Sequence, residues 1–164
     1  MSVRTCDRCT AETQAKKRCT RRTCIYGPFC WQHTNKFEKL KVAPSVYGGR
    51  GLFCFSRQRE VVFRKGDVIA EYTGDVLTPQ ELERIYPGDT LAEYTVQTPH
   101  RIVDAKRTNA GVARYANDCR GRIKRGRCNA EFVEKKRRIY LRALKNISSG
   151  DEILVSYGED YWRF

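Results

Sequence analysis

From about residue 39 onward, hydrophobic residues occur in short runs separated by turn residues. Runs rich in β-branched and aromatic residues predict strands at residues 61–63, 68–72, 93–96, 101–103, 139–144 and 153–157. The turns between them are short, and several contain a Gly-Asp pair. The pattern therefore predicts a mostly β domain with irregular connections and few helices.

One segment has the pattern of a helix instead. Thr78 is suited to the N-cap, Pro79 to the first helical position, and Glu81 to the acidic position of a capping box. An apolar stripe follows, and the Pro-Gly-Asp sequence at residues 87–89 ends the helix. A second short helix is expected within residues 109–115.

The first 36 residues have little hydrophobic periodicity and are rich in cysteine and basic residues. Five of the eight cysteines lie within the first 30 residues, whereas Cys54, Cys119 and Cys128 are scattered. Such a segment buries too little apolar surface to fold alone, and a bound metal ion could supply the missing stability. We therefore expect a small zinc-binding module at residues 1–36 ahead of a β domain at residues 39–164.

Six residues of this segment have side chains that bind zinc: Cys6, Cys9, Cys19, Cys24, Cys30 and His33. Cys6 and Cys9 form a CxxC pair, and Cys30 and His33 have the same spacing. Such pairs can share one tetrahedral Zn²⁺ ion, which favours thiolate and imidazole ligands. Without a secretion signal, disulfides are less expected than a metal. Six donors exceed four ligand positions, so the set stays open, and free thiols in a basic tail are the competing interpretation.

The formal net charge is +13, and much of it lies in three runs, at residues 16–22, 120–127 and 135–138. A solvated face would explain any one run, but three together favour contact with an anionic partner such as nucleic acid or a nucleosome surface. No stretch approaches the roughly 20 apolar residues of a transmembrane helix. We therefore expect an intracellular protein that does not associate with membranes.

Four short motifs follow one another along the β domain. They are Gly49-Arg50-Gly51, then Glu71-Tyr72-Thr73-Gly74, then Arg114-Tyr115-Ala116-Asn117-Asp118-Cys119 with Cys128-Asn129, and finally Gly150-Asp151-Glu152 with Ser156-Tyr157-Gly158. Each is weak alone, because a GxG sequence fits any tight turn. In this order they resemble the SET-domain lysine methyltransferases over about residues 40–164. The C-terminal Ser-Tyr-Gly-Glu-Asp-Tyr-Trp is similar to the minimal SET proteins of large DNA viruses.

The resemblance implies a β-clip-like SET fold of small curled sheets and short helices with a C-terminal pseudoknot, a rare exception to unthreaded topology. There, residues 114–119 and 153–157 would meet and build the active site. Residues 8–33 also resemble a short motif of three cysteines and one histidine found in proteins of large DNA viruses and their hosts. That likeness implies that the zinc ligands are Cys9, Cys19, Cys30 and His33, with Cys6 and Cys24 as alternative ligands.

The same resemblance implies methyl transfer from S-adenosylmethionine to a lysine side chain, with Tyr157 and Tyr72 as catalytic residues. The implied cofactor-binding residues are Gly49, Arg50, Gly51, Arg114, Asn117, Asp118, Tyr157 and Trp162. The implied substrate channel contains Tyr94, Phe132 and Val155. The expected substrate is a histone or nucleosome, and the expected location is the nucleus or a viral replication compartment, while the oligomeric state stays open.

The reaction needs a neutral lysine amine, and an apolar channel beside a sulfonium charge favours it, so no dedicated base is required. Phe132 and Val155 stand where some relatives carry a product-limiting tyrosine, which favours di- or trimethylation. Asp118 replaces the family's histidine. It is the best support for the alternative of a catalytically silent SET fold that binds chromatin or nucleic acid. A zinc-dependent nucleic-acid binding protein without methyltransferase ancestry would leave the four ordered motifs unexplained.

Overall fold

The computed structural model describes residues 6–58, 60–88, 91–120 and 127–158. Strands predominate, and they are β1 (Leu40–Pro44), β2 (Arg50–Cys54), β3 (Val61–Phe63), β4 (Val68–Glu71), β5 (Asp75–Leu77), β6 (Thr95–Thr98), β7 (Arg101–Asp104), β8 (Asn117–Asp118), β9 (Ala130–Lys135), β10 (Arg138–Ala143), β11 (Ile147–Ser148) and β12 (Leu154–Val155). The helices are α1 (Trp31–His33), the π-helix η1 (Thr34–Glu38), α2 (Pro79–Ile85) and the 3₁₀-helix η2 (Val112–Tyr115). The prediction of a mostly β fold with short helices is confirmed.

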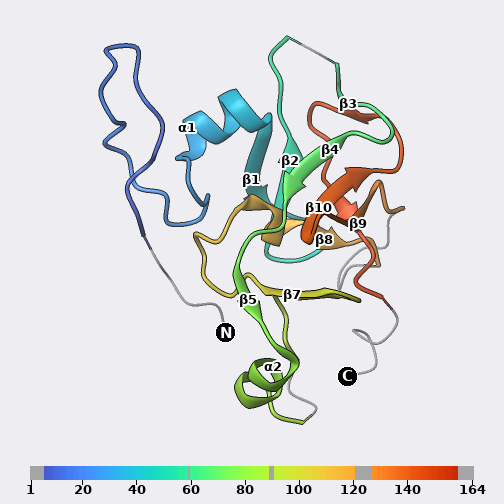
Figure 1. Cartoon of the computed structure of the whole chain (residues 1–164). Coiled ribbons are helices and arrows are strands. Elements are labelled where there is room, and N and C mark those ends of the chain that lie inside the picture. Colours follow the sequence, from blue (N-terminus) through green and yellow to red (C-terminus); the bar gives the residue numbers. More distant parts are fainter. Residues whose placement is uncertain (1–5, 59, 89–90, 121–126, 159–164) are drawn as a thin grey trace.

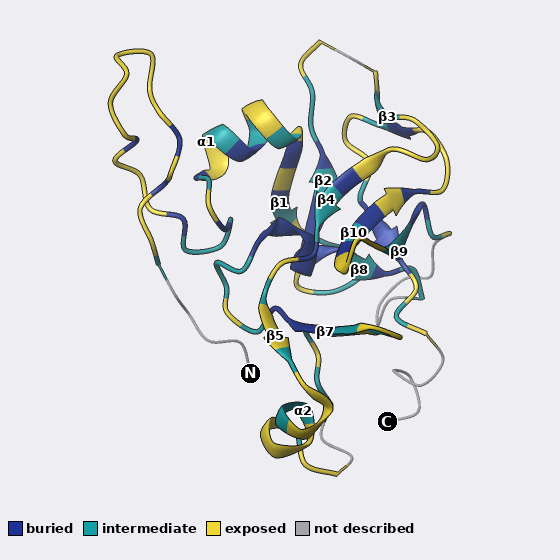
Figure 2. Cartoon of the chain, in the orientation of Figure 1, coloured by how far each residue is buried: buried dark blue, intermediate teal, exposed yellow. Residues whose placement is uncertain are grey.

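The strands form small sheets rather than one large one. The three-stranded sheets have the orders β4-β10-β9 and β5-β7-β6, and the pairs are β1-β2, β3-β11 and β8-β12. All of these pairings are antiparallel except β8 with β12, which is parallel. Figure 1 shows the sheets surrounding a common interior, and Figure 2 shows that buried residues face it. The largest fully buried apolar side chains there are Leu40, Leu52, Ile139, Leu141, Ile147, Ile153 and Val155.

Most element predictions agree with the structure, with shifted ends. The strand expected at residues 93–96 is β6, which begins at Thr95, and the one expected at 153–157 is shortened to β12. The second helix is the single 3₁₀ turn η2. Strands β2, β5, β8, β9 and β11 were not predicted, and neither was strand β1. Its alternation of buried and exposed residues ends at Pro44, and its partner β2 supplies the pairing that defines it.

Helix α2 begins as its sequence predicts. The Thr78 hydroxyl accepts from the Glu81 backbone N–H, and the Glu81 carboxylate accepts from the Thr78 backbone N–H, completing the capping box. Helix α2 lies at the edge of the fold, and none of its residues is buried. Its helical conformation is therefore stabilised by the capping box more than by packing. In the described part of the chain, no helix is long and apolar enough to cross a membrane.

Candidate active site and metal centre

The third and fourth sequence motifs meet where β8 and β12 pair in parallel. Leu154 lies opposite Asn117, and Val155 lies opposite Asp118. The Cys119 N–H donates to the Val155 carbonyl at 2.8 Å, which continues the ladder. Two short segments about 37 residues apart in sequence are thereby joined at the centre of the molecule. This is the meeting of residues 114–119 with 153–157 that the family resemblance implies.

Asp118 braces this junction. Its carboxylate is buried and accepts from two backbone amides, those of Tyr157 (2.6 Å) and Arg120 (2.6 Å). Hydrogen bonds to a carboxylate are among the shorter and stronger ones in proteins. The side chain therefore holds the backbone of Tyr157 in place.

Asn129 holds the other side of β12. Its side-chain oxygen accepts from the Leu154 N–H (2.8 Å), and its side-chain nitrogen donates to the Glu152 carbonyl (2.7 Å). The amide thus pairs with the strand much as a neighbouring backbone would. Asp118 and Asn129 together fix the strand from which Tyr157 projects.

A cavity of about 400 Å³ lies beside this junction. Tyr72, Phe132 and Tyr157 give it aromatic walls, and the Tyr72 and Phe132 rings meet edge to face at 5.4 Å. The Tyr157 hydroxyl donates to the Ala116 carbonyl (2.8 Å), and the Tyr72 hydroxyl donates to the Tyr94 carbonyl (2.8 Å). Two tyrosines from motifs 85 residues apart (157 − 72) therefore line one cavity, whose walls combine aromatic and polar side chains.

Charge is distributed unevenly around this cavity. Arg114 lines it, and its buried guanidinium lies against the rings of Tyr94 (3.9 Å) and Tyr115 (4.8 Å). Glu93 also lines the cavity, but it is exposed, so its carboxylate lies toward solvent. Burial raises the pKa of the Tyr72 hydroxyl, and the nearby Tyr157 adds to the effect. Tyr72 therefore stays neutral throughout the physiological pH range.

The GxG motif lies next to the β8–β12 junction, at the start of β2. The Asn117 side chain donates to the carbonyls of Gly48 (3.3 Å) and Arg50 (3.1 Å), and to Glu152 Oε1 (2.8 Å). Gly49 has φ +52°, and a side chain there would meet nothing within 4 Å. The backbone is thus open on this face and could receive a ligand.

Gly51 is required for a different reason. A Cβ at this position would overlap the Glu152 carboxylate, which also accepts from the Ser45 hydroxyl (2.6 Å). The second glycine of the motif therefore makes room for Glu152, which joins β2 to the segment before β12. Sequence reasoning quoted Glu152 within the fourth motif but gave it no role of its own.

A second cluster of functional side chains lies in the N-terminal part. Cys9, Cys19, Cys30 and His33 place one donor atom each within 4.8 Å of one another. His33 Nδ1 lies 3.4 Å from the sulfur atoms of both Cys9 and Cys30. Ligands of one tetrahedral Zn²⁺ ion would be separated by about 3.5 Å, given Zn–S near 2.3 Å and Zn–N near 2.0 Å. The three sulfurs and one nitrogen therefore fit such an ion.

The remaining cysteines of this part do not join the cluster. Cys6 and Cys24, the two alternative ligands, form a disulfide with each other, although disulfides were the less expected outcome for this segment. The hydrogen bond from the Thr23 N–H to the Asp7 carbonyl (2.9 Å) brings their neighbours together. Cys119 and Cys128 form a second disulfide.

Comparison with known proteins identifies the larger part of the chain. Residues 49–158 match the model of the SET domain, which is more than half of the chain. The chain belongs to the SET-domain family. It is also 28% identical over 134 residues to the "Histone-lysine N-methyltransferase mes-4" of Caenorhabditis elegans. That match covers 73% of this chain and 14% of the relative, so the chain spans only a small part of it. Both matches support lysine methyltransferase activity at the level of the family.

The SET domain brings together only part of the predicted site. Tyr72, Arg114, Phe132 and Tyr157 line the aromatic cavity. Tyr94 and Val155, which were expected in the channel, are not among the described residues that line it: Tyr94 faces Arg114, and Val155 is fully buried in β12. Trp162 lies outside the described residues. The sequence predicted a strand at this place but gave no site role to the residues of β6, which carry no motif and form much of the cavity wall.

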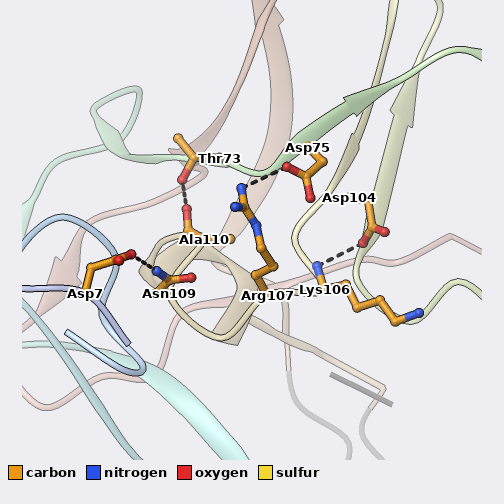
Figure 3. A network of polar contacts seen from close by, with 8 residues as sticks. All are labelled: Asp7, Thr73, Asp75, Asp104, Lys106, Arg107, Asn109 and Ala110. Atoms are coloured by element: carbon orange, nitrogen blue, oxygen red, sulfur yellow. Dashed lines mark hydrogen bonds and ion pairs between the residues drawn. The ribbon is translucent and has the colours of Figure 1, made fainter. Parts of the chain in front are cut away.

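The N-terminal part packs directly on the SET domain. Figure 3 shows Asp7 accepting from the Asn109 side chain, next to the hydrogen bond from Thr73 to the Ala110 carbonyl. The Tyr26 hydroxyl donates to the Val42 carbonyl (3.3 Å), and Tyr26 also packs against the main core. The N-terminal part thus contacts the segment 109–110, which in turn is hydrogen-bonded to Thr73, the residue after Tyr72.

Proposed function

We propose that the protein is a protein-lysine N-methyltransferase that takes the methyl group from S-adenosylmethionine and acts on a histone or histone-like tail. The observation that carries the proposal is the aromatic cavity, where Tyr72 and Tyr157 from two family motifs face one narrow space. An extended lysine side chain has the shape and the apolar stem to enter such a space. The relative's name, a histone-lysine methyltransferase, supports the choice of substrate.

The cavity walls favour the neutral form of the lysine amine. A lysine has a reference pKa near 10.4, so its deprotonation at pH 7 costs roughly 4–5 kcal/mol. An aromatic enclosure disfavours the ammonium by desolvation, and the buried positive charge of Arg114 acts in the same direction. Glu93 at the solvent side would attract the ammonium before it enters. No dedicated base is therefore needed.

The methyl donor fits the open backbone of the GxG motif. When bound, S-adenosylmethionine supplies a methyl group on a sulfonium centre. Gly49, Arg50 and Gly51 would hold it from one side and Asn117 from the other, since the Asn117 side chain already bridges to this loop. Arg114 lines the aromatic cavity and is placed to help hold the methyl donor there. Asp118 acts indirectly, by positioning Tyr157. Trp162 is proposed to cover the cofactor on family resemblance alone.

The site's shape bears on the product and on the alternative function. Phe132, which lines the cavity, has no hydroxyl that could hold a water or restrain the amine, and this favours di- or trimethylation. Asp118 was the best support for a catalytically silent SET fold. Its carboxylate binds two backbone amides of the active-site junction, so the substitution has a structural explanation that does not require loss of activity.

We propose zinc as the metal of the Cys9, Cys19, Cys30 and His33 cluster, with a structural role. All four ligand positions of a tetrahedral ion would be filled by protein, which is typical of structural rather than catalytic zinc. The buried apolar residues around it are few, namely Ala11 with the partly buried Phe29 besides the cysteines themselves. A metal would therefore supply most of the local stability. Residues 1–36 and 39–164 remain the proposed division into module and catalytic domain.

The deciding experiment is a methylation assay on histones and nucleosomes. The protein is incubated with labelled S-adenosylmethionine, and the products are read by mass spectrometry. We expect methyl-lysine on a histone, and we expect Tyr157→Phe to lower kcat by about a hundredfold or more because the hydroxyl that orders the site is lost. The stability cost should be only about 1 kcal/mol, since one hydrogen bond is removed. Near wild-type turnover of a folded Tyr157→Phe variant would show that this residue is not catalytic. Binding of the cofactor without methyl transfer to any histone would show that histones are not the substrate.

A further inference from the structure

A second large cavity lies on the side of the molecule formed by α1, η1 and β1. It is a groove of about 700 Å³, which is within the range of ligand sites. Its walls include the cations Lys36, Lys39, Lys41 and Arg57 and the aromatic residues Trp31 and Phe55, and we call it the basic groove. It shares no described lining residue with the aromatic cavity. It also lies outside the three basic runs that the sequence made conspicuous.

The cations of the basic groove have no counter-charge. Lys36, Lys39, Lys41 and Arg57 are exposed, and none of them forms an ion pair within the described part of the chain. No acidic residue is among the described residues that line the groove. Four like charges around one concave surface raise the local positive potential and favour an anion.

The fold keeps these cations close together. Lys39 adopts a left-handed conformation (φ +57°) at the end of η1, and its ammonium donates to the Lys36 carbonyl (2.8 Å). Glu38 lies between them in sequence, but its Oε2 is buried and Glu38 is not among the described residues that line the groove. The lysines are exposed, so theirs are the charges that a ligand in the groove would meet.

The aromatic residues narrow the choice of anion. Trp31 is 50% exposed, which is unusual for so large an apolar side chain. It lies at the start of α1 between Cys30 and His33, two residues of the metal cluster, so its backbone is held firmly. An exposed aromatic ring beside uncompensated cations is the combination that binds a single strand, in which phosphates meet the cations and an unstacked base stacks on the ring.

From this arrangement we infer that the basic groove binds single-stranded nucleic acid. The lysines and Arg57 neutralise successive phosphates, and Trp31 stacks on one base. A duplex would offer phosphates but no free base face, because its bases are stacked on one another. An acidic peptide would offer charge alone and would leave the exposed Trp31 ring unexplained.

The test is a binding titration with the zinc-loaded full chain. Fluorescence anisotropy follows a labelled single strand of about 12 nucleotides, which is within the usual site size. DNA and RNA strands, a duplex of the same sequence and poly-glutamate serve as competing probes. We expect a single strand to bind best, with log K falling against log salt at a slope of about −3 if four phosphates are neutralised.

Two variants separate charge from stacking. Lys36→Glu with Lys41→Glu should weaken binding of the single strand at least tenfold and reduce the salt slope by about 1.4. Trp31→Ala should weaken it roughly tenfold without changing the salt slope, and Trp31→Phe should restore part of the affinity. Lys65→Glu with Lys145→Glu changes the net charge equally on exposed residues outside the groove, so it should retain most of the affinity.

The binding titrations decide whether the groove binds single-stranded nucleic acid, and they do not depend on methyl transfer. Equal affinity for the duplex or for poly-glutamate, together with unchanged binding by Trp31→Ala, would overturn this inference. So would an equal loss in the two double-lysine variants, because binding would then follow net charge alone. Methylation of a free histone peptide should be unaffected by Trp31→Ala. The methylation assay therefore tests the proposed enzyme activity, and the binding assay separately tests whether the groove binds nucleic acid.

Discussion

At the residue scale, Asp118 shows how one side chain can position the backbone of Tyr157, the proposed catalytic residue. Each of its two carboxylate oxygens accepts from a different backbone amide, those of Arg120 and Tyr157. Asp118→Asn keeps the shape but leaves only one acceptor and places an NH₂ group against an N–H. We expect it to lower the free energy of unfolding by about 2 kcal/mol in urea titrations and to lower kcat. Unchanged stability would show that the carboxylate does not brace the junction.

Glu38 gives a second prediction at this scale, on pH. Burial raises the pKa of its carboxyl from 4.5 to about 7, and its Oε2 has no hydrogen-bond partner within the described part of the chain. The folded protein thus binds this proton more tightly than the unfolded chain, so the stabilisation is fully present below about pH 4.5 and is lost as the pH rises to about 7.

Glu38→Gln mimics the protonated form and should remove this loss. We expect the variant to be more stable than the wild type at about pH 8 and close to it at about pH 5, as measured by the urea midpoint. Glu60→Gln, at an exposed carboxyl, is the control and should leave the pH dependence unchanged. A wild type and a Glu38→Gln variant with parallel pH profiles would contradict the prediction.

At the scale of elements, the β9–β10 hairpin contains a strained turn. Lys135 pairs with Arg138, so Lys136 and Arg137 form a two-residue turn, with φ values of +51° and +59°. Such turns favour Asn-Gly, because left-handed conformations are costly for other residues. The double variant Lys136→Asn with Arg137→Gly should therefore raise the free energy of unfolding by about 1 kcal/mol in urea titrations. The exposed Lys145→Asn is the control, and a loss of stability in the double variant would refute the argument.

At the scale of the whole molecule, the metal cluster connects local folding to the active site. The N-terminal part contacts the SET domain at Asn109, and the next residue, Ala110, accepts a hydrogen bond from Thr73, which follows Tyr72. We expect elemental analysis to find about one zinc per chain, and Cys30→Ala to lose it, lower the Tm and reduce methyl transfer.

The matched control is Cys54, a buried cysteine outside the cluster. Burial raises the pKa of its thiol to about 12, so it stays protonated and is a poor metal ligand. Cys54→Ala should therefore keep the zinc and cost only local packing. A fully folded protein that contains no metal would refute the zinc proposal.

The sequence alone determined the features that depend on neighbouring residues. The capping box of α2 and half of the described strands follow from local hydrogen bonding and side-chain periodicity, which act within a few residues. The four motifs were recognisable because their order along the chain is itself sequence information. For this reason the family and the mostly β architecture could be predicted from the sequence.

Only the tertiary structure decided which side chains meet. Spacing alone left six zinc-binding candidates, and a motif resemblance favoured four of them; the fold gathered those four and paired Cys6 with Cys24. The fold also places the ring of Tyr94 against the buried guanidinium of Arg114, which lies 20 residues further along the chain. The basic groove joins residues 31–41 to residues 55–58, and no local pattern records that neighbourhood. Each of these results depends on contacts between distant segments, whose free energy is set by packing and by charge in the folded chain rather than by spacing along it.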